Sequence, residues 1–155
     1  MVNYVISKMT QKSAVSVAQW HYQDEYEFYD MTADPEDYQE LMNEELRGDS
    51  YYQVTQAGIL IGFFVVEKTD RQEVVEVGLG MAPELTGQGN GLEFVRAILK
   101  YVSRVKNPQK ILFDVAKFNV RAQKLYQKIG FKVVNYHEQE TNGGSYPFVL
   151  MVKSV

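Results

Sequence analysis

The feature that most constrains this fold is a predicted strand that leads, through three alternate glycines, into a predicted helix. The strand covers 74–81, the glycines are Gly87, Gly89 and Gly91, and the helix covers 92–105. Glycine lets the backbone curl so that successive N–H groups point inward, and it has no Cβ to block a ligand. The first N–H groups of a helix lack intrahelical partners and carry a partial positive charge. The stretch therefore favours a loop that binds a pyrophosphate.

The glycine spacing excludes two common phosphate-binding loops. The P-loop requires Gly-x-x-x-x-Gly-Lys, which the chain lacks, and the dinucleotide fingerprint requires Gly-x-Gly-x-x-Gly instead of Gly-x-Gly-x-Gly. An ordinary strand-to-helix turn remains the alternative. Three glycines in five residues are nevertheless costly in entropy unless the backbone approaches something closely.

The remaining pattern predicts one domain covering 1–155, a length that is sufficient to bury a core. The expected order is β-α-α-β-β-β-α-β-α-β-β, which implies a mixed sheet covered by helices. The segment 21–33 has no clear period and is expected to be a loop or a broken helix. The expected strands are 4–9, 51–55, 59–67, 74–81, 111–116, 131–137 and 147–153, and the expected helices are 11–20, 34–47, 92–105 and 119–129.

Composition excludes several kinds of site. The chain has no cysteine, so disulfides, thiolate metal sites and cysteine nucleophiles are absent. With only His21 and His137, a multi-histidine metal site is not expected either. The longest apolar run, 59–66, is too short to cross a membrane and the N-terminus lacks a signal pattern, so we expect a cytoplasmic protein. The net charge of −4 argues against general nucleic-acid binding.

Charge is distributed unevenly along the chain. The segment 21–50 holds eleven carboxylates and one cation, a net charge of −10. The segment 85–135 holds ten cations and two carboxylates, a net charge of +8. Two ligands of opposite charge on one domain would explain this distribution, and solvated helix faces of one sign are the alternative.

At these motifs the sequence resembles the GNAT superfamily of acetyl-CoA-dependent N-acetyltransferases. The family's pyrophosphate loop, usually Arg/Gln-x-x-Gly-x-Gly/Ala, corresponds to 86–91, with Thr86 in place of the usual Arg or Gln. A second family block, Asn-x-x-Ala-x-x-Leu-Tyr-x-x-x-Gly-Phe, is matched without a gap from Asn119 to Phe131. The resemblance implies the GNAT fold, a mixed α/β (α+β-like) fold whose mostly antiparallel sheet has about seven strands flanked by about four helices.

The resemblance also implies an activity, the direct transfer of an acetyl group from acetyl-CoA to a primary amine in a ternary complex. It assigns Tyr126 to protonate the leaving thiolate, and a backbone N–H at the end of the strand 74–81 is the candidate oxyanion donor. The candidate bases are Glu76, Asp114 and Glu73. Glu76 is ranked slightly above Asp114, because a charge in the middle of an apolar strand is costly. A solvent-facing edge position is the alternative for each of the three. The implied cofactor-binding residues are Leu79, Met81, Thr86, Gly87, Gln88, Gly89, Asn90, Gly91, Asn119 and Tyr126.

The amine acceptor is expected near the acidic segment. Tyr22, Tyr26 and Tyr29 fall where the family builds its acceptor pocket, with ordinary packing as the alternative. The negative charge of 21–50 favours a basic acceptor such as a polyamine, an amino sugar, or a lysine-rich peptide or N-terminus. A non-catalytic acyl-CoA-binding domain of the same fold, a nucleotide-binding domain of another fold and a homodimer remain open.

Overall fold

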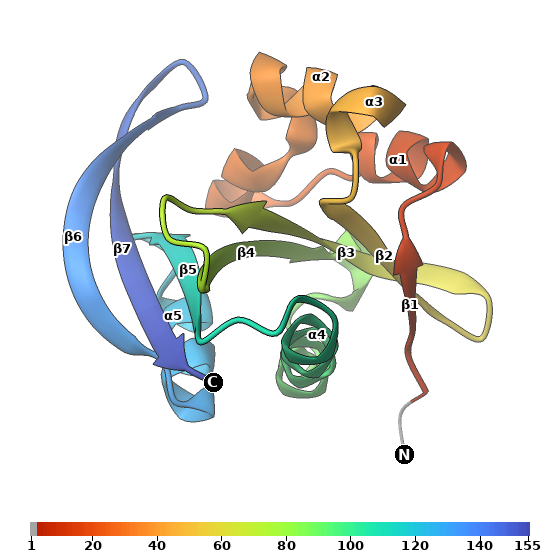
Figure 1. Cartoon of the computed structure of the whole chain (residues 1–155). Coiled ribbons are helices and arrows are strands. Elements are labelled where there is room, and N and C mark those ends of the chain that lie inside the picture. The colour runs from red at the N-terminus through yellow and green to blue at the C-terminus, as the bar shows by residue number, and fades with distance from the viewer. Residues whose placement is uncertain (1–2) are drawn as a thin grey trace. The chain divides into compact units, whose positions relative to one another are not determined.

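The computed structural model describes residues 3–155 and forms the mixed α/β fold expected from the sequence (Figure 1). Its sheet has seven strands in the order β1-β2-β3-β4-β5-β7-β6. The strands are β1 (Val5–Lys8), β2 (Tyr51–Gln56), β3 (Ile59–Lys68), β4 (Val74–Met81), β5 (Lys110–Ala116), β6 (Lys132–Thr141) and β7 (Gly144–Ser154). The α-helices are α1 (Gln11–Ala18), α2 (Pro35–Met42), α3 (Glu44–Arg47), α4 (Gly91–Lys106) and α5 (Val120–Ile129), and the 3₁₀ helices are η1 (Asp24–Tyr29), η2 (Met31–Ala33) and η3 (Pro83–Leu85).

The strand directions make the sheet mixed. β1 and β2, β2 and β3, and β5 and β7 pair antiparallel, whereas β4 and β5 pair in parallel. None of the helices formed by residues 3–155 is long and apolar enough to cross a bilayer. The single domain over 1–155 stays a prediction, because contacts group the chain into two compact units. One unit runs to Val65 and includes Leu79–Thr86 and Thr141–Gly144, and the other consists of Val66–Gly78, Gly87–Glu140 and Ser145–Val155.

In the first unit, the helix expected over 34–47 is in fact two helices, α2 and α3 (Figure 1). The break is at Asn43, whose backbone is extended and whose side chain accepts hydrogen bonds from the N–H groups of Glu45 (2.9 Å) and Leu46 (3.2 Å). A new helix therefore begins there. Leu41 on α2 is fully buried, whereas Leu46 on α3 is 60% exposed, although both would share the apolar side of one continuous helix over 34–47.

The 3₁₀ helices η1 and η2 occupy the segment that lacked a clear period, in agreement with a broken helix. The core of this unit is an apolar cluster on which Trp20 and Phe63 also pack. Its buried members are Met9, Ala14, Val17, Ala18, Leu41 and Tyr51.

In the second unit, the long helix α4 confirms the periodicity of its sequence. Its buried residues recur at helical spacing, so one face packs into the core. Phe113 of β5 stacks on Tyr126 of α5, with ring centroids 4.0 Å apart and an angle of 7° between the ring planes. The buried residues of α4 are Phe94, Val95, Ile98, Leu99 and Val102.

The last two strands are longer than their apolar pattern indicated. The sequence predicts 131–137 and 147–153, but the strands continue to a two-residue turn at Asn142 and Gly143. Both turn residues have positive φ, 52° and 75°, as a tight type I′ hairpin turn requires. The polar residues near the turn show no apolar alternation, so the sequence pattern did not extend the strands that far.

Candidate active site

The glycine loop leads into a helix N-terminus that has no side-chain cap. Gly87 and Gly89 have φ of +72° and +81°, a region that L-residues with a Cβ rarely adopt. Asn90 precedes α4, and its side chain makes no capping hydrogen bond. The other four α-helices of the described chain are capped by the side chains of Thr10, Asp34, Asn43 and Asn119. An anion would therefore satisfy the first N–H groups of α4 in place of a side chain.

A guanidinium lies beside this loop. A Cβ placed on Gly87 would be 3.5 Å from Nη1 of Arg121, in the first turn of α5. Asn119, two residues earlier, caps the same helix by accepting a hydrogen bond from the N–H of Ala122 at 3.1 Å. Guanidinium groups match phosphate oxygens in geometry and charge. In the sequence, Arg121 is only one of the ten cations of 85–135, because Gly87, its neighbour in space, is 34 positions away.

Tyr126, the expected general acid, is a buried residue at 7% exposure. Its ring is stacked between α5 and β5 on Phe113 and lies near Phe131, with centroids 6.1 Å apart. The backbone carbonyl of Tyr126 accepts a hydrogen bond from the N–H of Phe131, closing the helix after Gly130. The tyrosine therefore has a packing role, whatever its hydroxyl does.

The two main candidate bases lie on the same face of the sheet. Glu76 on β4 is opposite Leu112 on β5, and Asp114 is two residues beyond Leu112. Because side chains two residues apart point to the same side of a strand, Glu76 and Asp114 share that face. Phe113, which lies between Leu112 and Asp114 in the sequence, points to the opposite face of the sheet, where it stacks on Tyr126.

His137 on β6 joins this pair, a contact that no sequence pattern predicts. Its Nε2 lies 2.8 Å and 3.0 Å from the two carboxylate oxygens of Asp114. The pKa of Glu76 is raised by burial and by the charges of Asp114 and Glu67, and His137 opposes this effect. The pKa of His137 is raised by its hydrogen bond to Asp114 and by the charges around it, against burial.

The expected alternative of a solvent-facing edge position is wrong for Asp114. β5 lies inside the sheet between β4 and β7, and the Asp114 side chain is only 16% exposed. Glu76 is half-buried, whereas Glu73, directly before β4, is exposed. Asp114 and Glu76 are therefore both partly enclosed within the sheet, whereas Glu73 is not.

In the first unit, Tyr22 binds the end of β4. Its hydroxyl donates a hydrogen bond of 2.7 Å to the carbonyl of Met81, and its N–H donates to Asp30 at 2.8 Å. Burial, with the negative charges of Asp30 and Glu84, raises the pKa of the Tyr22 hydroxyl. Leu79 also lies in this last part of β4.

The other expected residues of the first unit lie on or next to 3₁₀ helices. Thr86 directly follows η3, and its hydroxyl donates to the carbonyl of Pro83 at 2.8 Å. Tyr26 and Tyr29 both belong to η1, where the ring of Tyr29 meets that of Phe28 edge to face at 5.5 Å. The acidic 21–33 segment is therefore ordered around aromatic side chains.

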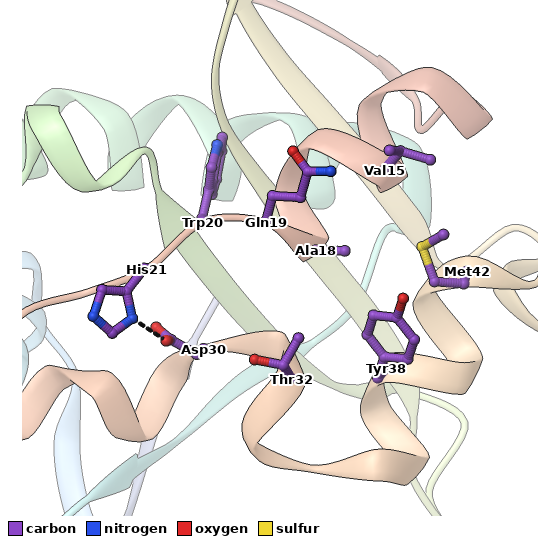
Figure 2. A pocket seen from close by; sticks show the side chains of 9 residues that line it. All are labelled: Val15, Ala18, Gln19, Trp20, His21, Asp30, Thr32, Tyr38 and Met42. Carbon is purple, nitrogen blue, oxygen red and sulfur yellow. Dashed lines mark hydrogen bonds and ion pairs between the residues drawn. The ribbon is translucent and has the colours of Figure 1, made fainter.

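A pocket of about 500 Å³ also lies in this unit (Figure 2). At one end His21 and Asp30 meet, with Nδ1 and Oδ2 2.6 Å apart, and this hydrogen bond raises the pKa of His21. None of the three expected acceptor tyrosines lines it. Its walls are Val15, Ala18, Gln19, Trp20, His21, Asp30, Thr32, Tyr38 and Met42.

Many carboxylates of the acidic segment have local structural partners. Asp30 accepts hydrogen bonds, Asp34 caps α2, and Glu40 accepts from the hydroxyl of Tyr51 at 2.7 Å. Others lie in the first turns of α2 and α3, where negative charge stabilises a helix. Among residues 3–155, no group of three or more His, Cys, Asp or Glu side chains could hold a metal ion.

Comparison with solved structures finds the same fold in several acetyltransferases. A GNAT-family acetyltransferase from Bacillus anthracis has 19% identity and a TM-score of 0.76, with 99% of this chain and 96% of that chain covered. A chimeric spermidine N-acetyltransferase from Vibrio cholerae has 21% identity and a TM-score of 0.74, with 97% and 95% covered. The aminoglycoside acetyltransferase AAC(6′)-Ib in complex with coenzyme A has 22% identity and a TM-score of 0.75, with 98% and 95% covered.

Comparison at the level of sequence gives the family. No curated protein matches the sequence. A family model described as an acetyltransferase (GNAT) domain matches residues 4–132, most of the chain and both motifs described above. The uncapped helix at the glycine loop and the mixed seven-stranded sheet agree with that match. The chain therefore belongs to the GNAT family of acetyltransferases.

Proposed function

We propose that the protein is an N-acetyltransferase that moves the acetyl group of acetyl-CoA directly to a primary amine in a ternary complex. The observation that carries the cofactor part is the start of α4, which combines left-handed glycines, an uncapped helix N-terminus and the guanidinium of Arg121. Backbone N–H groups and a guanidinium are both donors suited to a pyrophosphate. The residues present therefore fit coenzyme A.

In this proposal, Gly87, Gln88, Gly89, Asn90 and Gly91 offer backbone donors to the pyrophosphate. Arg121 supplies the positive charge that Thr86, in place of the family's usual Arg or Gln, does not carry. We further propose that Leu79, Met81, Thr86, Asn119 and Tyr126 border the bound cofactor. When bound, acetyl-CoA supplies the activated acetyl thioester.

The proton transfers of the proposed reaction are assigned to side chains of this protein. We propose that Glu76 takes a proton from the acceptor ammonium, whose pKa in solution is about 8 to 10, either directly or through water. Its raised pKa makes it a stronger base than an ordinary carboxylate. Asp114 is the alternative base. A backbone N–H at the end of β4 would donate a hydrogen bond to the acetyl oxygen, and the Tyr126 hydroxyl would supply a proton to the CoA sulfur.

We propose a cationic small molecule or peptide amine as the acceptor, bound near Tyr22, Tyr26 and Tyr29. The net charge of −10 over 21–50 would attract such a molecule. A spermidine N-acetyltransferase and an aminoglycoside acetyltransferase share the fold, and the names of both describe amine substrates. A cytoplasmic location and a homodimer stay predictions from the sequence.

The cofactor site is tested with Gly89→Glu, which places bulk and negative charge in the loop. Gly58→Glu is a matched control, because Gly58 also has positive φ, +78°, and nothing within 4 Å of an added Cβ. We expect CoA to raise the Tm of the wild type and of Gly58→Glu but not of Gly89→Glu. A folded Gly89→Glu protein that binds CoA like the wild type would show that the loop assignment is wrong.

Turnover is tested with a panel of amines by following release of free CoA. Tyr126→Phe should keep CoA binding and lower kcat by roughly 10²–10⁴-fold if the hydroxyl is the general acid. Unchanged kcat across pH would leave Tyr126 with packing alone. CoA binding without turnover of any amine would favour the non-catalytic acyl-CoA-binding alternative.

Acceptor charge is tested by reversing Asp24, Glu25 and Glu27 together to Lys. This variant should raise KM for a basic acceptor and leave CoA binding unchanged, because screening limits the effect to a Debye length of about 8 Å. The control reverses the same number of exposed carboxylates outside the acidic segment. A neutral or acidic best acceptor, or an equal KM in both variants, would exclude the proposed class. The control residues are Asp70, Glu138 and Glu140.

A further inference from the structure

The second unit contains a group of titratable side chains contributed by four strands of the sheet. Glu76 on β4, Asp114 on β5 and His137 on β6 interact, and Glu67 on β3 adds a further negative charge. On β7, which lies between β5 and β6, the uncharged ring of Phe148 has its centroid 6.2 Å from that of His137. The charged groups that face one another here are thus three carboxylates and one imidazole.

His137 is held in a defined orientation in this group. Its Nε2–H donates to both oxygens of Asp114, at 2.8 Å and 3.0 Å, and the side chains are 29% and 16% exposed. On β7, Leu150 is directly opposite Asp114. Because apolar neighbours and partial burial reduce solvent screening, a change of charge on the His137–Asp114 pair shifts the pKa values of nearby ionisable groups.

Glu76 is the nearby group that such a change affects. Its register partner Leu112 is two residues from Asp114 on the same face, so the two carboxylates are diagonal neighbours. The charge of Asp114 hinders ionisation of Glu76, whereas His137 favours it. With a proton on the imidazole the pair is neutral overall, and without it the pair carries one negative charge.

We propose that His137 is a positioning residue that acts on Glu76 through Asp114, so that its proton decides whether the pair beside Glu76 is neutral or negative. The proposal rests on the proposed role of Glu76 as the base. Loss of the imidazole proton then leaves a negative charge beside Glu76 and makes it a stronger base. Base strength therefore rises with pH as the imidazole of His137, whose pKa lies above its ordinary value of 6.5, loses its proton.

The test compares two variants that should move the titration of Glu76 in opposite directions. His137→Gln removes the positive charge, so the pKa of Glu76 should rise. Asp114→Asn removes the negative charge, so the pKa of Glu76 should fall, and the pKa of His137 should fall with it. A purely structural role would lower stability in both variants without opposite shifts.

The Glu76 carboxyl is followed by NMR on protein labelled with ¹³C at the glutamate carboxyl, and its resonance is assigned with Glu76→Gln. The chain has only two histidines, so the imidazole of His137 can be followed without overlap. His21→Gln assigns the other imidazole and is the matched control, because His21 also pairs with an aspartate, Asp30. The control should leave the titration of Glu76 unchanged.

Reciprocity provides a measurement that does not depend on the two main variants. Because Glu76 raises the pKa of His137, Glu76→Gln should lower it. The proposal is overturned if the titration of Glu76 stays fixed, or moves the same way, in His137→Gln and Asp114→Asn. It is also overturned if Glu76→Gln leaves the titration of His137 where it was.

The acid limb of kcat/KM separates this proposal from the proposed function. If Glu76 is the base, that limb should move in each variant with the NMR titration. If the NMR titrations shift as expected while Glu76→Gln retains full activity, the coupling stands and the role of Glu76 as base fails.

Discussion

Asp34 makes two different connections with its two carboxylate oxygens. Oδ1 accepts hydrogen bonds from the N–H groups of Glu36 (2.9 Å) and Asp37 (3.3 Å) and so caps α2. Oδ2 accepts from the hydroxyl of Thr141 (2.9 Å) and the N–H of Asn142 (3.2 Å) at the hairpin turn. Different substitutions can therefore remove one connection or both.

Asp34→Ala removes the cap and both hydrogen bonds to the turn. A cap contributes about 1 kcal/mol and each further hydrogen bond about 1 kcal/mol, so we expect a loss of about 3 kcal/mol. For a chain of this length, that loss lowers Tm by about 6–12 °C. Asp34→Asn keeps a good capping oxygen but turns an NH₂ group toward the N–H of Asn142, so we expect about 2 kcal/mol. Thr141→Val removes a single hydrogen bond and should cost about 1 kcal/mol.

Urea unfolding of the wild type and the three variants at neutral pH measures these differences. Equal losses in Asp34→Asn and Asp34→Ala would refute the division of roles between the two oxygens. A loss below about 0.5 kcal/mol in Asp34→Ala would refute the reasoning as a whole, since it would match an ordinary surface substitution.

The same carboxylate predicts a pH dependence. Burial opposes ionisation of Asp34, but hydrogen bonds from Asn142, Thr141, Asp37 and Glu36 outweigh it and lower the pKa below 3.8. A group whose pKa is lower in the folded state stabilises it above its unfolded pKa, and the contribution is lost as the pH falls through the folded value. The stability difference between wild type and Asp34→Asn should therefore shrink below pH 3.8 and stay constant above about pH 5.

Two further substitutions test the packing at the end of β4. Tyr22→Phe loses the hydrogen bond to the carbonyl of Met81 and should cost about 1 kcal/mol. Because burial and nearby carboxylates raise the pKa of Tyr22, the wild type should lose stability above about pH 10 more steeply than Tyr22→Phe in urea unfolding; parallel curves would contradict this. Gly80→Ala places its Cβ 2.6 Å from the ring of Phe63 and should cost about 1–3 kcal/mol. Gly78→Ala on the same strand meets nothing within 4 Å, and an equal loss in both would refute the close contact.

Local sequence signals predicted most elements because each depends on neighbouring residues. The helix expected over 92–105 has an apolar repeat that only a helix places on one face, and α4 confirms it. The Asn119 cap and the Gly130 stop mark the ends of α5 for the same local reason. The prediction of one continuous helix over 34–47 was wrong for a local reason as well. The Asn43 side chain accepts a hydrogen bond from an N–H group of the next helix, so a new helix begins there although the apolar repeat continues past it.

Some residues of the candidate site could likewise be recognised from local sequence signals, and others could not. The glycine loop and the block from Asn119 to Phe131 could be recognised from the sequence, since their spacing is set within a few residues. Arg121 beside Gly87 and the pairing of His137 with Asp114 could not, because strand order and register bring these residues together.

The sequence by itself determined the periodic faces, the turns and the family motifs, all of which follow from the conformational preferences of short segments. Only the tertiary structure decided that Thr141 would reach Asp34, 107 residues earlier, and that Asp114 would be enclosed within the sheet instead of exposed at an edge. The physical reason is that a side chain's hydrogen-bond partners, and therefore its proton affinity, are set by whatever the sheet brings next to it. Local sequence patterns do not specify which distant strand will lie next to a given side chain.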